Sequence, residues 1–223
     1  MKKSRRRRPI FAVLFWIVVL AAAALVARER RLLDFSRFLS LFSRHGDPVL
    51  AALGVLPRSA WGAAAPKSAP PAMSRATRIT VHHDGAAVFR EYDRAATVRK
   101  LQGIQRYHQE AKGWGDIAYH FVIDRKGRIW EGRPLSQTGA HAGSAAANEG
   151  NIGILLLGNF DVQVPSGAQT ESLRRLLEAL CRSRGIPRSR VLGHGDMRRE
   201  CGLGATNCPG RHLDAWLENF RGA

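Results

Sequence analysis

The chain has 223 residues, 45 % of them apolar and 24 % charged, which suits one packed domain with additional segments and excludes general disorder. Its formal net charge is +17, and eleven Lys/Arg against three Asp/Glu place +8 of this within residues 1–55. This charge suits nucleic acid, anionic lipid or an acidic wall polymer and does not choose among them. Three cysteines, at positions 181, 201 and 208, exclude a disulfide framework.

Residues 1–27 have the pattern of a membrane signal. Six Lys/Arg lie within the first eight residues, and Ile10 to Ala27 follow without a charged side chain. A helix of that length reaches about 27 Å, close to the roughly 30 Å hydrocarbon core of a bilayer. Because basic residues stay on the cytoplasmic side, we expect a single-pass anchor in the cytoplasmic (inner) membrane with the rest of the chain outside, in the periplasm. The alternative is a cleaved signal peptide, with Ala22 to Ala24 at the cleavage site, which would make the protein secreted.

Residues 28–55 form a connecting segment. Apolar residues recur in it at helical spacing, with arginines between them: Leu32, Phe35, Leu39 and Phe42. This pattern predicts an amphipathic helix, which either lies on the membrane surface or packs on the following domain as a stalk. Gly46, Asp47 and Pro48 end the pattern.

Residues 56–223 alternate between strand and helix patterns and are expected to form one domain. We predict strands over 78–82, 119–124, 128–131 and 151–157 and near residue 191, with 119–124 and 128–131 joined as a hairpin. We predict helices over 94–112, from 166 or 170 to just before Gly185, and from about residue 211. This order predicts an α/β domain with a mixed central sheet flanked by helices.

Two histidines and a cysteine stand next to predicted elements. His82 ends the first strand, His194 follows the strand near 191, and Cys208 precedes the last helix. Imidazole and thiolate are common zinc ligands, and three protein ligands leave a fourth position for a water molecule. Spacing alone supports this site weakly, because isolated histidines more often are hydrogen-bonded core or surface groups.

A series of short motifs along residues 58–210 strengthens the case for a metal site at these three residues. They are Arg58-Ser-Ala-Trp-Gly62, Ile79-Thr-Val-His-His83, Ile104-Gln-Arg-Tyr-His108, Gly113-Trp-Gly-Asp-Ile-Ala-Tyr-His-Phe121, Trp130-Glu-Gly-Arg133, Gly139-Ala-His-Ala142, Asn151-Ile-Gly-Ile154, Gly158-Asn-Phe160, Gly193-His194 and Cys208-Pro-Gly210. From about Leu56 to its end, the sequence resembles peptidoglycan recognition proteins of the type 2 N-acetylmuramoyl-L-alanine amidase superfamily.

The resemblance implies a zinc enzyme of the bacterial cell wall. It implies Zn²⁺ on His82, His194 and Cys208, with Tyr119 beside the metal, and hydrolysis of the lactyl amide between N-acetylmuramic acid and L-alanine. The groove for muramyl peptides would include His83, His108, Lys112, Trp114 and His141. We therefore expect peptidoglycan and, through the N-terminal helix, a membrane as partners of a monomer, and no nucleic acid.

Departures from the family pattern keep several alternatives open. Phage-type members have a lysine two residues before the cysteine, where this chain has Thr206, which we assign to the catalytic group. Residues 197–205 resemble an insertion and offer Cys201 as an alternative ligand. A related branch has a glutamate in the strand that here reads Leu155 to Leu157, so the general base stays open. A membrane-tethered, non-catalytic peptidoglycan-binding module is the alternative function.

Four residues have competing interpretations. By its helical position His108 reads as a structural histidine, and only the resemblance favours a groove role. Alternation along a strand predicts that Tyr119 and His120 point in opposite directions, so one of them leaves the site. Cys181 lies on the apolar side of its helix and reads as a core thiol.

Overall fold

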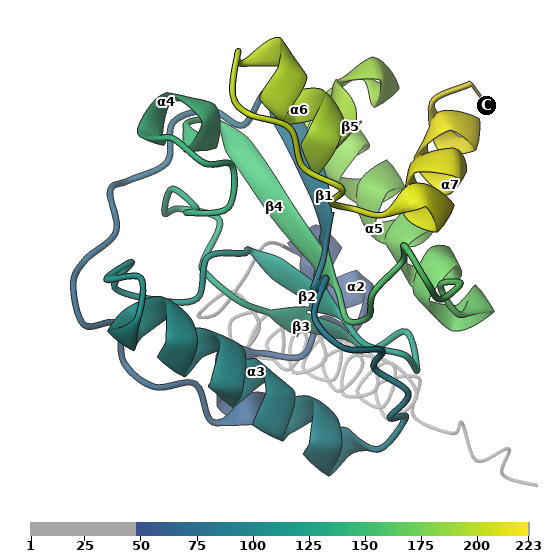
Figure 1. The fold of residues 1–223 in the computed structure, drawn as a ribbon. Coiled ribbons are helices and arrows are strands. Elements are labelled where there is room, and N and C mark those ends of the chain that lie inside the picture. The colour runs from purple at the N-terminus through teal and green to yellow at the C-terminus, as the bar shows by residue number, and fades with distance from the viewer. Residues whose placement is uncertain (1–47, 223) are drawn as a thin grey trace, which may run out of the picture. The chain divides into compact units, whose positions relative to one another are not determined.

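Five strands form one mixed sheet in the computed structural model, which describes residues 48–222 (Figure 1). The strands lie in the order β3-β2-β4-β1-β5. Their bounds are β1 (Arg78–His83), β2 (Phe121–Ile123), β3 (Ile129–Glu131), β4 (Asn151–Leu156) and β5 (Val191–Gly193). β3 is antiparallel to β2, and the other neighbours are parallel. The predicted mixed central sheet is confirmed.

Helices cover both faces of this sheet, which confirms the predicted α/β class. α3 (Arg94–Glu110) packs on one face, and α5 (Gly167–Arg184) and α7 (Arg211–Gly222) pack on the other (Figure 1). Shorter elements are α2 (Pro48–Ala52), η1 (Arg58–Trp61), α4 (Ala145–Asn148), η2 (Arg188–Arg190) and α6 (His194–Glu200). Among residues 48–222 no helix is long and apolar enough to cross a bilayer. The predicted membrane segment, and the connecting segment as far as residue 47, lie outside the described residues.

Local signals in the sequence set the ends of the two long helices. The Asp93 carboxylate accepts hydrogen bonds from the backbone N–H groups of Ala95 and Ala96, so it caps α3 as predicted. Ser166 caps α5 in a capping box with Gln169, and Gly185 ends the helix in the left-handed conformation. The boundaries predicted for these helices are confirmed to within about two residues.

One local prediction is wrong, and one element was not predicted. β2 begins at Phe121, so Tyr119 and His120 precede the strand and the alternation argument does not apply to them. Residues 197–205, which resemble an insertion, begin within α6, whose only buried residue is Met197. Without an apolar stripe, this short helix has no sequence pattern by which to find it.

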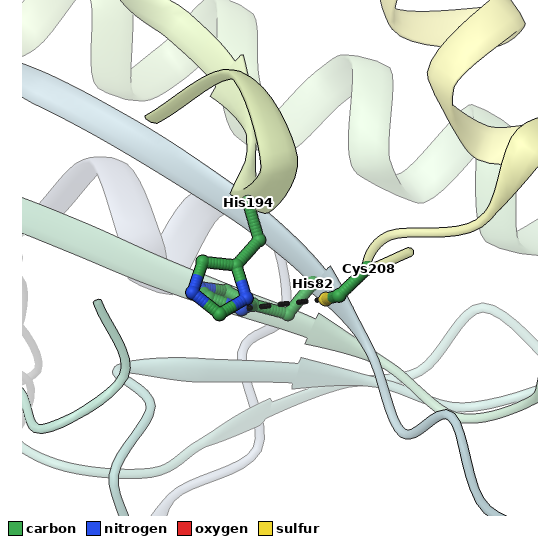
Figure 2. A group of neighbouring side chains, drawn as sticks. All are labelled: His82, His194 and Cys208. Carbon is green, nitrogen blue, oxygen red and sulfur yellow. Dashed lines mark hydrogen bonds between the residues drawn. The ribbon is translucent and has the colours of Figure 1, made fainter. Parts of the chain in front are cut away.

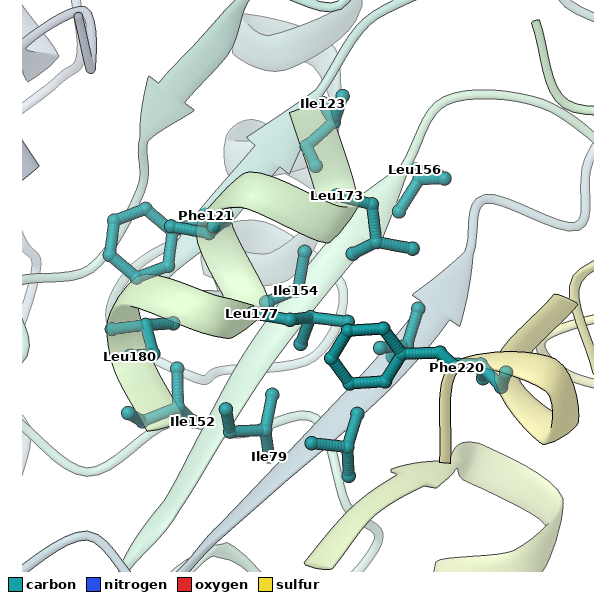
Figure 3. Close-up of a cluster of buried hydrophobic side chains, with 14 of the residues drawn as sticks. Ile79, Phe121, Ile123, Ile152, Ile154, Leu156, Leu173, Leu177, Leu180 and Phe220 are labelled. Carbon is teal, nitrogen blue, oxygen red and sulfur yellow. The ribbon is translucent and has the colours of Figure 1, made fainter. Parts of the chain in front are cut away.

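The larger apolar core lies between the sheet and the pair α5 and α7 (Figure 3). Strand side chains alternate between faces, so β1 contributes Ile79 and Val81 to this core, while Thr80 and His82 face α3. The same period sends Leu155 of β4 toward α3, where it packs with Leu101. His82 is thus fixed on the α3 face by the strand that buries its neighbours.

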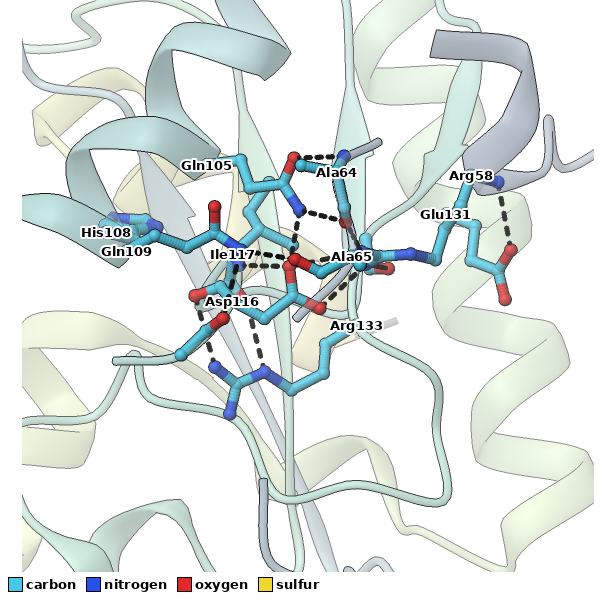
Figure 4. Close-up of polar contacts among 12 residues, drawn as sticks. Arg58, Ala64, Ala65, Gln105, His108, Gln109, Asp116, Ile117, Glu131 and Arg133 are labelled. Carbon is cyan, nitrogen blue, oxygen red and sulfur yellow. Dashed lines mark hydrogen bonds and ion pairs between the residues drawn. The ribbon is translucent and has the colours of Figure 1, made fainter. Parts of the chain in front are cut away.

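A buried ion-pair network holds the segment between α3 and β2 (Figure 4). The Asp116 side chain is fully buried and lies 3.0 Å from the Arg58 guanidinium. Asp116 also accepts hydrogen bonds from Gln105 Nε2 and from the N–H of Ile117, both at 2.7 Å. Arg133 donates to the carbonyl oxygens of Ile117 and Trp114. The backbone N–H of Arg133 also donates to the Tyr119 carbonyl at 2.8 Å, so this network holds both Trp114 and Tyr119.

We expect Asp116→Ala to lower the free energy of unfolding by about 3–5 kcal/mol, because it leaves buried guanidinium groups without their counter-charge. The matched control is Glu110→Ala, which removes the ion pair between Glu110 and Lys67. The side chains of this pair are 58 % and 55 % exposed, respectively. That change costs less than about 1 kcal/mol. Urea denaturation of the full-length protein measures both, and equal losses would contradict the role given to Asp116.

Candidate metal centre

Three side chains converge at the carboxyl ends of β1 and β5 (Figure 2). His82 is the penultimate residue of β1, and His194 directly follows β5. Because Val81 pairs with Gly193, the residues that follow them, His82 and His194, become neighbours. Their ring centroids lie 4.4 Å apart. Cys208 approaches from the loop before α7, with Sγ 3.6 Å from Nδ1 of His82. The three potential ligand atoms lie within 4.8 Å of one another.

This donor set fits zinc. Two imidazoles and a thiolate are typical ligands, and two donors on one tetrahedral zinc ion lie roughly 3.5 Å apart, close to the separation of Cys208 and His82. Cys201, in contrast, is exposed and lies with its sulfur 3.8 Å from that of Met197. Among the described residues the geometry therefore favours Cys208 over Cys201.

Burial keeps the donors uncharged when no metal is bound. It lowers the pKa of His82 well below its ordinary value, with the neighbouring His141 and His194 adding to the effect. Burial also lowers the pKa of His194 to about 4 and raises the pKa of the Cys208 thiol to about 12. The imidazoles thus keep a lone pair, while the thiol has to release its proton on metal binding.

Two hydrogen bonds hold the loop that carries Cys208. The N–H of Cys208 donates to Oγ1 of Thr206 at 3.2 Å, and the N–H of Gly195 donates to the Cys208 carbonyl at 2.8 Å. Thr206, which the sequence assigned to catalysis, therefore supports the conformation of the cysteine loop. Gly195 follows His194, so the second bond ties two of the ligands together.

A groove of about 480 Å³ lies on the α3 face beside the cluster. Of the predicted site residues, it is lined by Tyr119 and His108. Tyr119 lies 5.2 Å from His82 between ring centroids, and burial raises the pKa of its hydroxyl, which therefore stays a hydrogen-bond donor. Asp84 and Lys100, paired at 2.6 Å, line the same groove and were not predicted. Lys100, Ile104 and His108 are four residues apart on α3, a signal that could have identified this lining.

His108 presents one defined hydrogen-bonding form to the groove. Its Nδ1 accepts from the backbone N–H of Ala118 at 3.1 Å, so the proton of the neutral ring sits on Nε2. Burial, with the charges of Arg133 and Lys112, lowers the pKa of His108 to about 4. The ring is therefore a neutral N–H donor near pH 7, and it combines the structural and groove roles that the sequence left open.

The other residues predicted for the groove lie around it or beneath it. His83 is buried, and its Nδ1 accepts from the N–H of Phe160 at 3.1 Å. Trp114 is 39 % exposed and lies 5.0 Å from His108 between ring centroids. The Lys112 ammonium lies 6.0 Å from the Trp114 ring. His141 is buried and hydrogen-bonded to His82 at 3.0 Å, so it lies under the cluster rather than in the groove lining.

The fold and the cluster together define a class of protein: an α/β domain with a His-His-Cys donor set beside a groove at the carboxyl edge of its parallel strands. Residues 72–211 match the sequence profile of the N-acetylmuramoyl-L-alanine amidase family, and the chain belongs to that family. It is a member of the superfamily of type 2 amidases and peptidoglycan recognition proteins, as the resemblance implied.

Individual relatives agree with this assignment. Peptidoglycan-recognition protein SC2 of Drosophila melanogaster is 32 % identical over 171 residues, which cover 75 % of this chain and 86 % of that protein. The N-acetylmuramoyl-L-alanine amidase of Homo sapiens is 30 % identical over 75 % of this chain and 28 % of its own length. Among solved structures, Drosophila PGRP-LB matches with a TM-score of 0.62 and 32 % identity, over 72 % of this chain and 90 % of that one. Peptidoglycan recognition protein-LE in complex with tracheal cytotoxin matches with a TM-score of 0.64 and 29 % identity, over 74 % and 92 %.

His120, whose ring centroid lies 5.9 Å from that of His141, makes the stability of the fold depend on pH. It is fully buried, its Nδ1 accepts from the N–H of Gly153 at 2.9 Å, and its Nε2 donates to the Gln137 carbonyl at 2.9 Å. Burial lowers its pKa from 6.5 to about 4. Between pH 6.5 and about 4 the unfolded chain binds a proton at His120 and the native state does not. The contribution of His120 to the free energy of unfolding is therefore fully present above pH 6.5 and is lost as the pH falls toward 4.

We expect the metal-free protein to lose on the order of 3 kcal/mol of unfolding free energy through His120 alone as the pH falls from about 7 to about 4. Urea denaturation in the presence of a chelator measures this loss without the contribution of metal release. The variant His120→Gln is expected to show a smaller difference between the two pH values. A pH dependence identical to that of the wild type would contradict this account.

Proposed function

We propose that this chain is a zinc-dependent N-acetylmuramoyl-L-alanine amidase that hydrolyses the lactyl amide between N-acetylmuramic acid and L-alanine in peptidoglycan. The observation that carries the proposal is the convergence of His82, His194 and Cys208 within 4.8 Å. Family membership supports the reaction class, and the complex of the related PGRP-LE with tracheal cytotoxin, a monomeric diaminopimelic acid-type peptidoglycan, supports the substrate.

In this proposal His82, His194 and Cys208 hold the metal. A bound zinc ion supplies a Lewis acid and, near neutral pH, a hydroxide. The Tyr119 hydroxyl donates a hydrogen bond to the oxygen that becomes negatively charged as the amide is attacked. The Nε2–H of His108 donates a hydrogen bond to a carbonyl of the substrate's stem peptide in the groove and orients that peptide. Arg99, which also lines the groove, favours an anionic stem peptide.

The location of the enzyme forms part of the proposal. We place the amidase domain outside the cytoplasmic membrane, tethered by the apolar segment from Ile10 to Ala27, because the basic tail before it favours the cytoplasmic side. Signal cleavage would release the same domain into the periplasm. Protease treatment of intact spheroplasts tests this, and a protected domain would overturn it.

We expect purified full-length protein to release free peptides from muropeptides and to stop doing so in the presence of a chelator. Cys208→Ser is expected to lose both bound zinc and activity. Each loss should exceed the roughly 10–100-fold decrease typical of mutating residues that only contact the metal ligands. Cys201→Ser is the matched control, because this exposed thiol lies apart from the cluster. Mass spectrometry of the products and metal analysis of each variant make the measurement.

Tyr119→Phe separates metal binding from catalysis in the same assay. It removes one hydroxyl and is expected to lower turnover by about 10²–10³-fold while zinc content stays at the wild-type level. Zinc-loaded wild type without cleavage, or full activity in Cys208→Ser, would refute the proposed reaction.

A second candidate function is a non-catalytic, membrane-tethered module that binds peptidoglycan. It is favoured by Thr206, which stands where phage-type relatives have a lysine and whose oxygen is bound to the N–H of Cys208. This function predicts sedimentation with purified cell walls, no metal in the isolated protein and no release of peptides.

A further inference from the structure

We propose that His141 is a positioning residue that fixes the ring proton of His82 on Nε2 and thereby makes Nδ1 the metal-binding atom. The inference rests on the proposed zinc site. It departs from the substrate-binding role that the family resemblance implied for His141. The burial of its ring under His82, instead of in the groove lining, motivates the change.

The assignment of protons starts from a backbone carbonyl. Nε2 of His141 lies 3.1 Å from the carbonyl oxygen of Asn151, which can only accept, so this nitrogen carries the proton. In a neutral imidazole the other nitrogen, Nδ1, then has a lone pair. It lies 3.0 Å from Nε2 of His82, which must therefore donate. The remaining nitrogen of His82, Nδ1, keeps its lone pair and is the atom that lies 3.6 Å from Cys208 Sγ.

The His141 ring has little freedom to take another position. The Asn148 side chain accepts from the backbone N–H groups of His141 and Ala142, at 2.9 and 2.8 Å. Beneath the ring, a Cβ added at Gly153 would lie 2.4 Å from Cδ2 of His141, and one added at Gly139 would lie 2.5 Å away. The two glycines thus provide the space that the imidazole fills, and Gly153 belongs to β4, two residues after the carbonyl that binds His141.

This arrangement has a definite consequence for metal binding. The two tautomers of a neutral imidazole are both accessible, and a hydrogen bond to one nitrogen decides which nitrogen is free to bind a metal. Without His141, His82 can hold its proton on Nδ1, toward the sulfur, and has to move it before binding. Loss of such a partner lowers metal affinity by about 10–100-fold.

The test compares full-length His141→Ala, which removes the acceptor, with His141→Asn, whose side-chain oxygen can replace Nδ1. Zinc affinity is measured by competition with a chromophoric chelator. We expect a loss of about 10–100-fold for the alanine variant and substantial recovery for the asparagine variant. Gly153→Ala, which keeps His141 but displaces its ring, is expected to lose affinity as well. His212→Ala, a histidine of α7 to which we assign no role, is the control.

A second measurement does not depend on zinc. Nitrogen-15 chemical shifts of the histidine rings in metal-free wild type are expected to show His82 protonated on Nε2. A proton on Nδ1 would overturn the proposal, as would wild-type zinc affinity in a folded His141→Ala protein. If that variant does not fold, the nitrogen shifts and the asparagine variant decide. Wild type that binds no zinc would refute the proposed function, whereas the shifts would still test the hydrogen-bond arrangement.

Discussion

The parallel pairing of β1 between β4 and β5 is the interaction on which the rest of the structure depends. Parallel strands end at the same edge of a sheet, so His82 at the end of β1 and His194 after β5 become neighbours although they are far apart in sequence. The third donor follows from packing on the opposite face. Leu213 and Leu217 bury α7 in the main core, and the loop before this helix carries Cys208 to the sheet edge. The burial that stabilises the fold therefore also assembles the donors.

Burial of several imidazoles imposes a second constraint. A buried ring nitrogen needs a hydrogen-bond partner, and here backbone groups supply most of them. A backbone N–H can only donate and a carbonyl can only accept, so each contact also determines where the ring proton lies. The buried rings held in this way are His83, His108, His120 and His141. For His108 and His141, the hydrogen bonds that satisfy the folded chain thus also decide which nitrogen faces the groove or the cluster.

Most of the fold could be predicted from the sequence because its long elements have strong patterns. The apolar run of β4 and the capping residues Asp93 and Ser166 gave boundaries close to those observed. Short elements without an apolar stripe, such as α6, could not be found in this way. The strand prediction around Tyr119 failed because loop bonds, including the Asp116 network, hold this segment before β2 begins.

The site was predictable only in part, for a related reason. The metal donors stand at element ends, which sequence motifs mark, but the groove lining depends on contacts between distant elements. Asp84 follows β1 and Lys100 lies on α3, and their pairing appears only after the two pack together. His141 lies in a loop rich in glycine and alanine, a kind of segment that usually runs over the surface. The His141 ring is buried nevertheless, because Gly139 and Gly153 leave space for it.

Under the proposed function, the charge of the metal and the dipoles of neutral hydrogen-bond donors together stabilise the reacting amide. The 2.6 Å contact with Asp84 largely compensates the charge of Lys100, and Thr206 brings no charge to the cysteine loop. The donors that line the groove beside the cluster, Tyr119 and His108, are both neutral near pH 7. Negative charge that develops on the amide oxygen would then be stabilised mainly by the metal and by preorganised N–H and O–H dipoles. Such dipoles keep their protonation over a wide pH range, so the lower pH limit of this site would be set by loss of the metal and of the fold before a catalytic group gains a proton.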